Sequence, residues 1–274
     1  MFLQRLLVVL LLLPIGLWAL FSSDVSFGIF ITIVCLIASI EYIKMFRLGG
    51  FQPANLAIVG AVFFALASVT YYKIPLPLEF VVPFILLAAA SHLLSFERGR
   101  DDAVLDLTIS LAGIVYIGVL GSYFMALRVL PGGDWWLFTV LTCVWWADTG
   151  AYFIGKNFGK HTLAPRLSPN KTWEGYIGGI VLTLIGSPLL LYLYWALDLP
   201  VVETITIARV MVLAAFLGVL PALGDLTISM FKRYFNIKDS GRILAGHGGM
   251  LDRIDSWLWA VSIGYYLVTL VFLP

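Results

Sequence analysis

The chain has 274 residues, of which 61% are hydrophobic and only 12% are charged, whereas a typical soluble domain has about 25% charged residues. So little polar surface excludes a soluble globular enzyme. The formal net charge of +1 gives no sign of a nucleic-acid partner. We expect a polytopic membrane protein.

Long apolar runs fill most of the sequence. A helix needs about 20 apolar residues to cross a bilayer core about 30 Å thick, so the expected fold class is an all-α polytopic membrane protein with about nine transmembrane helices. The run 103–127 carries Asp106, and the run 203–231 is too long for one straight span and should project into the cytoplasm. In chain order the runs are 3–21, 25–43, 54–72, 77–95, 103–127, 135–154, 173–197, 203–231 and 251–273.

The runs divide into an N-terminal region, 1–130, with about five spans, and a C-terminal region, 131–274, which holds most of the polar residues. The first run resembles a signal peptide but lacks a clear small-x-small cleavage site, so we expect a retained helix. Cys35 and Cys143 lie in separate runs and indicate neither a disulfide framework nor a metal site.

The Lys and Arg residues predict the orientation in the membrane. With nine spans, all 17 of them except Lys73, Arg128 and Arg209 fall on the side of the N-terminus. Basic loops stay in the cytoplasm, so we expect the N-terminus inside, the C-terminus outside and a multi-pass protein of the cytoplasmic (inner) membrane. The two longest loops, 155–172 and 232–250, then lie on the cytoplasmic face, and long loops in a compact protein are usually functional.

The first of these loops has the signals of an anion site. Asp148 should lie near its entrance, at the cytoplasmic end of the sixth span. Thr172 can cap the next helix, with Glu174 in the first turn. Lys171 then stands just ahead of a helix N-terminus, where free N–H groups and a basic side chain can hold phosphate. Alternatively, lysines such as Lys156 only mark the cytoplasmic side.

The eighth run carries a polar helix face. Asp225 and Ser229 are four residues apart and Lys232 follows after nearly one more turn, so the three can share a face. An Asp that faces lipid is disfavoured, so Asp225 should point into the protein.

Two carboxylates begin the last run. Asp252 and Asp255 are three residues apart and follow a glycine-rich turn, 246–249, whose N–H groups can converge on an anion. Together with Asp225 they could offer Mg²⁺ the oxygen ligands it prefers. The alternative is that Arg233 and Arg253 pair with these carboxylates as structural salt bridges.

The motifs of residues 145–256 resemble one family. The run from Ser229 to Asp255 reads S-x-F-K-R-x4-K-D-S-G-x2-L-x-G-H-G-G-x-L-D-R-I-D. With the stretches 148–152 (D-T-G-A-Y) and 168–175 (S-P-N-K-T-W-E-G), it is similar to the signature of the phosphatidate cytidylyltransferases (CDP-diacylglycerol synthases). Ala245 replaces the usual proline before Gly-His-Gly-Gly, which removes neither a ligand nor a charge. The first half of the chain is similar only as a series of hydrophobic spans.

The resemblance implies that CTP and phosphatidate give CDP-diacylglycerol and pyrophosphate, with Mg²⁺ required, a second cation possible and a homodimer expected. It implies metal binding and catalysis by Asp225, Asp252 and Asp255, and catalysis and phosphate binding by Lys171. The other residues expected to bind substrate are Asp148, Ser229, Lys232, Arg233, Lys238, Asp239, His247, Gly248 and Gly249.

Two alternatives remain open. A related CTP-dependent enzyme acting on another lipid or polyprenyl substrate would share the membrane setting and the nucleotide. An ion-coupled transporter would also carry intramembrane acids, but the sequence lacks two repeated halves with broken helices.

Overall fold

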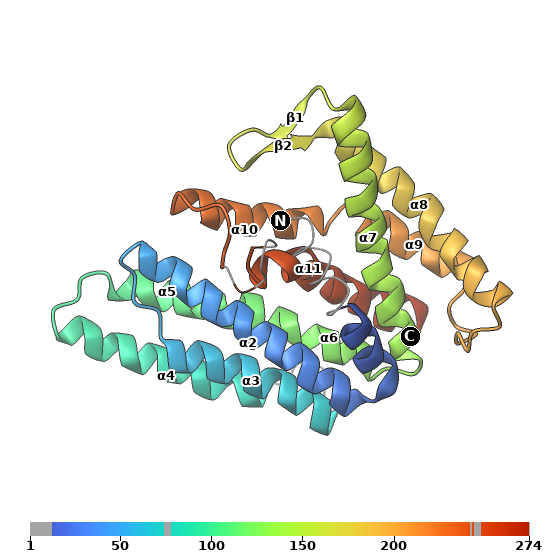
Figure 1. The fold of residues 1–274 in the computed structure, drawn as a ribbon. Coiled ribbons are helices and arrows are strands. Elements are labelled where there is room, and N and C mark those ends of the chain that lie inside the picture. The colour runs from blue at the N-terminus through green and yellow to red at the C-terminus, as the bar shows by residue number, and fades with distance from the viewer. Residues whose placement is uncertain (1–12, 74–77, 242, 244–247, 274) are drawn as a thin grey trace. The chain divides into compact units, whose positions relative to one another are not determined.

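The computed structural model of the protein describes residues 13–73, 78–241, 243 and 248–273 (Figure 1). These residues include eight helical segments long and apolar enough to cross a membrane, so the chain is a multi-pass membrane protein. The helices are α2 (Asp24–Leu48), α3 (Asn55–Tyr72), α4 (Leu78–Glu97), α5 (Ala103–Gly113), η1 (Ile114–Val119), α6 (Leu120–Arg128), α7 (Gly133–Phe158), α8 (Trp173–Ala196), α9 (Ile207–Leu217), α10 (Ala222–Tyr234), α11 (Leu251–Leu267) and η2 (Val268–Phe272).

The all-α class is confirmed, apart from one short hairpin. The second to ninth predicted spans match helical segments to within a few residues. Most of the first predicted span, 3–21, lies outside the described residues, and its described end belongs to a helix at Leu13–Ser22. The count of nine therefore stays a prediction.

The chain forms two compact units. The first contains residues 1–129 and 234–254, and the second contains residues 130–233 and 255–274. The segment between α10 and α11 thus belongs with the N-terminal helices, although more than 100 residues separate them. The contacts described below for each functional residue lie within one unit.

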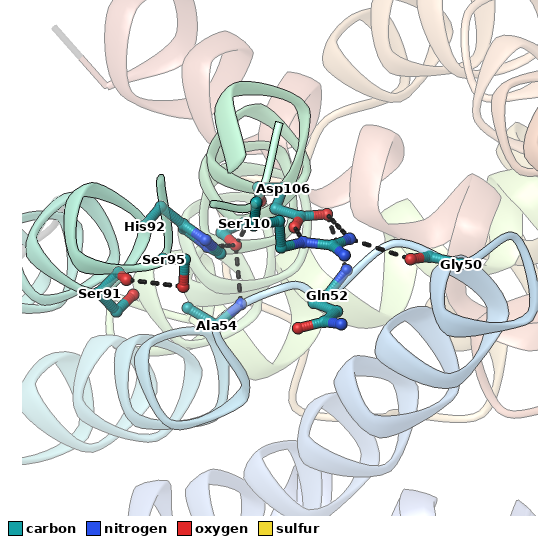
Figure 2. A network of polar contacts seen from close by, with 9 residues as sticks. Gly50, Gln52, Ala54, Ser91, His92, Ser95, Asp106 and Ser110 are labelled. Atoms are coloured by element: carbon teal, nitrogen blue, oxygen red, sulfur yellow. Dashed lines mark hydrogen bonds and ion pairs between the residues drawn. The ribbon is translucent and has the colours of Figure 1, made fainter. Parts of the chain in front are cut away.

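In the first unit, α3 packs against α2, α4 and the continuous span formed by α5, η1 and α6. The acid in that span, Asp106, is fully buried but not unpaired (Figure 2). It forms an ion pair with Arg100 and accepts a 2.7 Å hydrogen bond from the N–H of Gln52. The hydrogen bond from Arg100 to Asp106 also raises the pKa of the guanidinium group. A buried charge needs this kind of pairing, so a span with an internal acid is possible here.

The same network holds the α2–α3 connection. The Ser110 hydroxyl accepts a 2.8 Å hydrogen bond from the N–H of Ala54 and lies 3.0 Å from Nε2 of His92 (Figure 2). His92 is therefore a buried core residue. Cys35 and Cys143 are buried free cysteines.

In the second unit, α7 packs along α8, and both contact α9. The predicted loop 155–172 is largely ordered: α7 continues to Phe158, and a hairpin follows from β1 (Thr162–Ala164) and β2 (Ser168–Thr172). The two strands pair antiparallel, with Thr162 opposite Thr172 and Ala164 opposite Ser168. This hairpin is the exception to the all-α prediction among the described residues.

The eighth predicted span is broken. Residues 218–221, between α9 and α10, include Gly218 and Pro221, and proline has no N–H to continue a helix. The Val219 carbonyl oxygen accepts a 3.1 Å hydrogen bond from the Tyr176 hydroxyl, so it keeps a partner at the break. The break explains how a run too long for one straight helix can still form a membrane span. It also makes α10 a separate helix, which carries Asp225.

Candidate active site

A pocket of about 260 Å³ lies in the second unit. It is lined by residues of α7, β2 and α8 and by residues on both sides of the α9–α10 break. Its polar lining includes Asp148, Asn170, Lys171, Asp225 and Ser256. Three of the residues predicted from sequence, Asp148, Lys171 and Asp225, thus meet at one cavity.

Close packing of α7 on α8 forms one wall of this pocket. A Cβ atom on Gly179 would lie 2.6 Å from the Ala147 carbonyl oxygen, and one on Gly175 would lie 2.7 Å from the Ala151 carbonyl oxygen. Small residues four apart let helix backbones approach in this way in membranes. Because Asp148 directly follows Ala147, this contact fixes its backbone at the pocket.

Lys171 and Asp225 form an ion pair across the pocket. The predicted cap is confirmed, because the Thr172 hydroxyl accepts a 3.1 Å hydrogen bond from the N–H of Gly175. The predicted polar face of α10 is also confirmed in part, since the Ser229 hydroxyl donates a 3.2 Å hydrogen bond to Asp225. Lys232 is buried on the same helix.

The hairpin is tied down on two sides. Glu174 accepts hydrogen bonds from the backbone N–H groups of Lys160, at 3.0 Å, and His161, at 3.2 Å. The Arg233 side chain donates a 3.0 Å hydrogen bond to the Leu167 carbonyl oxygen at the hairpin turn. Arg233, which was predicted to contact phosphate, thus has a contact that orders the segment carrying Lys171.

Asp252 lies in the first unit, where its carboxylate holds the segment before α11. Its Oδ2 atom accepts hydrogen bonds from the N–H groups of Ser240, at 2.8 Å, and Gly249, at 3.0 Å. Gly248 has a φ of +79°, which favours glycine. A Cβ atom there would lie 3.0 Å from Asp252 Oδ2 and 3.2 Å from Asp239 Oδ1, so the loop passes close to two carboxylates. His247 lies outside the described residues.

A second cavity, of about 670 Å³, opens in the first unit. Lys238 and Asp239 line it, as do Lys44 and Arg47 at the end of α2. Lys238 and Asp239 were expected from the motif, whereas Lys44 and Arg47 of α2 were not. Only the fold brings these segments together.

Glu41 on α2 was not among the site residues expected from the sequence either. This side chain is only 2% exposed. Its Oε2 atom accepts hydrogen bonds from the Ser240 hydroxyl, at 3.0 Å, and from the N–H of Leu251, at 2.9 Å. An acid inside an apolar run was the available signal, since such residues are rarely without a function.

Asp255 is 6% exposed, and its Oδ1 atom accepts a 2.6 Å hydrogen bond from the N–H of Ser256. In the part of the chain that the structure describes, no three Asp, Glu, His or Cys side chains form a group that could hold a metal ion. Magnesium needs only one or two carboxylates when water and substrate phosphates complete its shell. The two carboxylates that line the pocket, Asp148 and Asp225, meet that requirement.

Comparison with known proteins places this geometry in context. Phosphatidate cytidylyltransferase of Bacillus subtilis (strain 168) is 43% identical over 163 residues, which cover 59% of this chain and 58% of that protein. The enzyme of the same name from Staphylococcus haemolyticus (strain JCSC1435) is 40% identical over 159 residues, 58% of each chain. These alignments span less than two thirds of the relatives' length. The model of the family described as "Cytidylyltransferase family" matches residues 3–271, so the chain belongs to this family.

Proposed function

We propose that the protein transfers the cytidylyl group of CTP to phosphatidate, giving CDP-diacylglycerol and pyrophosphate. The observation that carries this proposal is the pocket of the second unit, in which Asp148, Lys171 and Asp225 meet. The names of the two relatives support the choice of substrate. Membership of the cytidylyltransferase family favours this reaction over ion transport.

The reaction needs charge control more than a strong base. An oxygen of the phosphatidate phosphate attacks the α-phosphorus of CTP, and the bond from that phosphorus to the oxygen of the β-phosphate breaks. Pyrophosphate leaves with that oxygen and the bonding electrons. A phosphate monoester has a second pKa of about 6, so the nucleophile is already largely anionic at neutral pH. Catalysis then depends on bringing two polyanions together.

The Lys171–Asp225 pair suits that task. Each side chain is about one third exposed, at 30% for Lys171 and 33% for Asp225, so both can reach a ligand. Lys171 can exchange its carboxylate partner for a phosphate oxygen, and Asp225 can then accept a cation in place of the ammonium group. The hydroxyl of Ser229 keeps Asp225 oriented during this exchange.

Mg²⁺ is the proposed cofactor, and when bound it would neutralise charge on the phosphates. Asp225 would hold it from the pocket, with Asp252 and Asp255 as the further ligands implied by the family signature. Asp148 lines the same pocket and offers another oxygen. The basic side chains of Lys232, Arg233 and Lys238 would neutralise the remaining phosphate charge.

The setting agrees with a lipid substrate. Phosphatidate presents its phosphate at the membrane surface, and CTP would arrive from the cytoplasm. We therefore propose that the loops 155–172 and 232–250 face the cytoplasm, in the cytoplasmic membrane of the cell. A homodimer is part of the same proposal.

Activity of the purified chain in detergent tests the proposal. We expect CTP, phosphatidate and Mg²⁺ together to give equal amounts of CDP-diacylglycerol and pyrophosphate, with little product from ATP or UTP. Polyprenyl phosphate and other lipid phosphates serve as competing acceptors. Faster cytidylyl transfer to one of these would replace phosphatidate as the substrate, and no pyrophosphate from any acceptor would overturn the proposed function.

A further inference from the structure

Glu41 joins two segments that follow it by about 200 residues. Its Oε2 atom accepts a hydrogen bond from Ser240, 199 residues later, and another from Leu251, 210 residues later. All three residues belong to the first unit. One carboxylate oxygen from α2 therefore ties together the two ends of the loop that leads into α11.

Glycines allow the carboxylate to enter this loop. A Cβ atom on Gly241 would collide with Oε1 of Glu41, and one on Gly249 would collide with Oε2. Oε1 is buried and has no hydrogen-bond partner among the described residues. Burying a carboxylate costs free energy unless its oxygens are well paired. An apolar side chain would fill this space without that cost, so the acid indicates a task beyond packing.

The contacts of Glu41 lead directly to Asp252. The Ser240 hydroxyl donates a hydrogen bond to Glu41, and the Ser240 backbone N–H donates one to Asp252. Leu251, whose N–H binds Glu41, is the residue before Asp252. The orientation of the Asp252 carboxylate is thus set by a chain of hydrogen bonds that begins on α2.

We infer that Glu41 is a positioning residue for the proposed reaction: from α2 it fixes Ser240 and the first turn of α11, and through them the carboxylate of Asp252. This inference rests on the proposed function, in which Asp252 acts at the phosphates. It assigns a role in the reaction to the N-terminal half of the chain, where the family motifs do not reach.

Three single variants and one double variant of the full chain, purified in detergent, test the inference. Mutation of a residue that orients a metal ligand typically lowers metal affinity or activity by about 10- to 100-fold. We therefore expect Glu41→Ala to lower kcat by at least about tenfold, with a smaller change in KM for CTP. Glu41→Gln keeps one acceptor oxygen and should retain more activity than Glu41→Ala. Ser240→Ala should lower kcat, and combining it with Glu41→Ala should cost no more than Glu41→Ala alone, because the two act in series.

Ser39→Ala is the matched control. Ser39 is buried on the same helix, and its hydroxyl donates a 2.7 Å hydrogen bond to the Leu36 carbonyl oxygen, its one partner among the described residues. It should keep the wild-type kcat. A drop in kcat equal to that of Ser240→Ala would show that any buried change in this region lowers activity, and would overturn the inference.

Hydrogen exchange separates this inference from the proposed function. In Glu41→Ala, the amides of Ser240 and Leu251 should exchange faster, while those of α3 should not change. Faster exchange throughout the first unit, with unchanged kcat per folded molecule, would mean a structural role and would overturn the inference, as would unchanged exchange and unchanged kcat. If wild-type protein transferred no cytidylyl group, the proposed function would fall and this inference with it, whereas an active wild type with unchanged kcat in Glu41→Ala would overturn the inference alone.

Discussion

At the scale of single residues, substitutions in the ion pair of Lys171 and Asp225 should change activity far more than stability. Both side chains are partly exposed, and ion pairs of that kind contribute only about 0–1 kcal/mol to stability. Substitutions here should therefore leave the fold intact and report on the chemistry.

Replacing Asp225 by Asn keeps the size of the side chain but removes a negative charge from the pocket. We expect turnover to fall by at least about 100-fold, because metal charge stabilisation is worth several kcal/mol and each 1.4 kcal/mol is about tenfold in rate. The measurement is Mg²⁺-dependent formation of CDP-diacylglycerol, normalised to folded protein.

Asp134→Asn is the control for this variant, since Asp134 lies in the first turn of α7 and accepts a local 2.9 Å hydrogen bond from the N–H of Trp135. It should match wild type. If Asp225→Asn kept more than about half of the activity across a Mg²⁺ titration, the metal role would be abandoned in favour of the salt-bridge alternative.

Residue-level prediction succeeded where the partner was near in sequence. Thr172 was predicted to cap the next helix, and Asp225 and Ser229 were predicted to share a helix face, on which they form a hydrogen bond. Glu41 was missed because it stands alone in an apolar run and its partners come about 200 residues later. No periodic pattern connects residues at that separation.

At the scale of elements, the α7–α8 pair carries the pocket. Gly175 and Gly179 let α8 approach the backbone of α7. The position of Asp148 relative to Lys171 therefore depends on having glycine, with no side chain, at both places. Both helices and the Thr172 cap were predicted from the sequence. The β1–β2 hairpin was not, because its residues are mostly polar and lack the alternation that marks a strand.

Alanine at Gly179 tests this packing. Its Cβ atom would lie 2.6 Å from a backbone oxygen, and overpacking of this kind costs about 1–3 kcal/mol. We expect a lower melting temperature in detergent and lower activity, even though alanine favours a helix over glycine by about 1 kcal/mol.

Gly118→Ala is the same chemical change at a buried position that has room for a methyl group, because its Cβ atom would lie 3.6 Å from Val62, an ordinary van der Waals distance. It should be neutral or slightly stabilising. Equal melting temperatures for the two alanine variants would contradict the packing argument.

At the scale of the whole molecule, the distribution of Lys and Arg predicts how the chain is oriented in the membrane. Introduced cysteines can test it, because Cys35 and Cys143 are both buried and should give little background. In intact cells, Arg98→Cys and Asn157→Cys should be protected from a membrane-impermeant reagent, whereas Leu199→Cys and Pro274→Cys should be labelled. Labelling of Asn157→Cys and Leu199→Cys from the same side would contradict the nine-span topology.

The long reach of Glu41 has a consequence for how the chain is made. Ribosomes add about 5–20 residues per second, so α2 is synthesised roughly 10–40 s before Ser240 leaves the ribosome, given the 199 residues between them. During that interval the acid of α2 has entered the membrane without the partners that later bury it. We therefore expect chains that end before Ser240 to be less stable in the membrane than the full chain, since Glu41 would lack both of these partners.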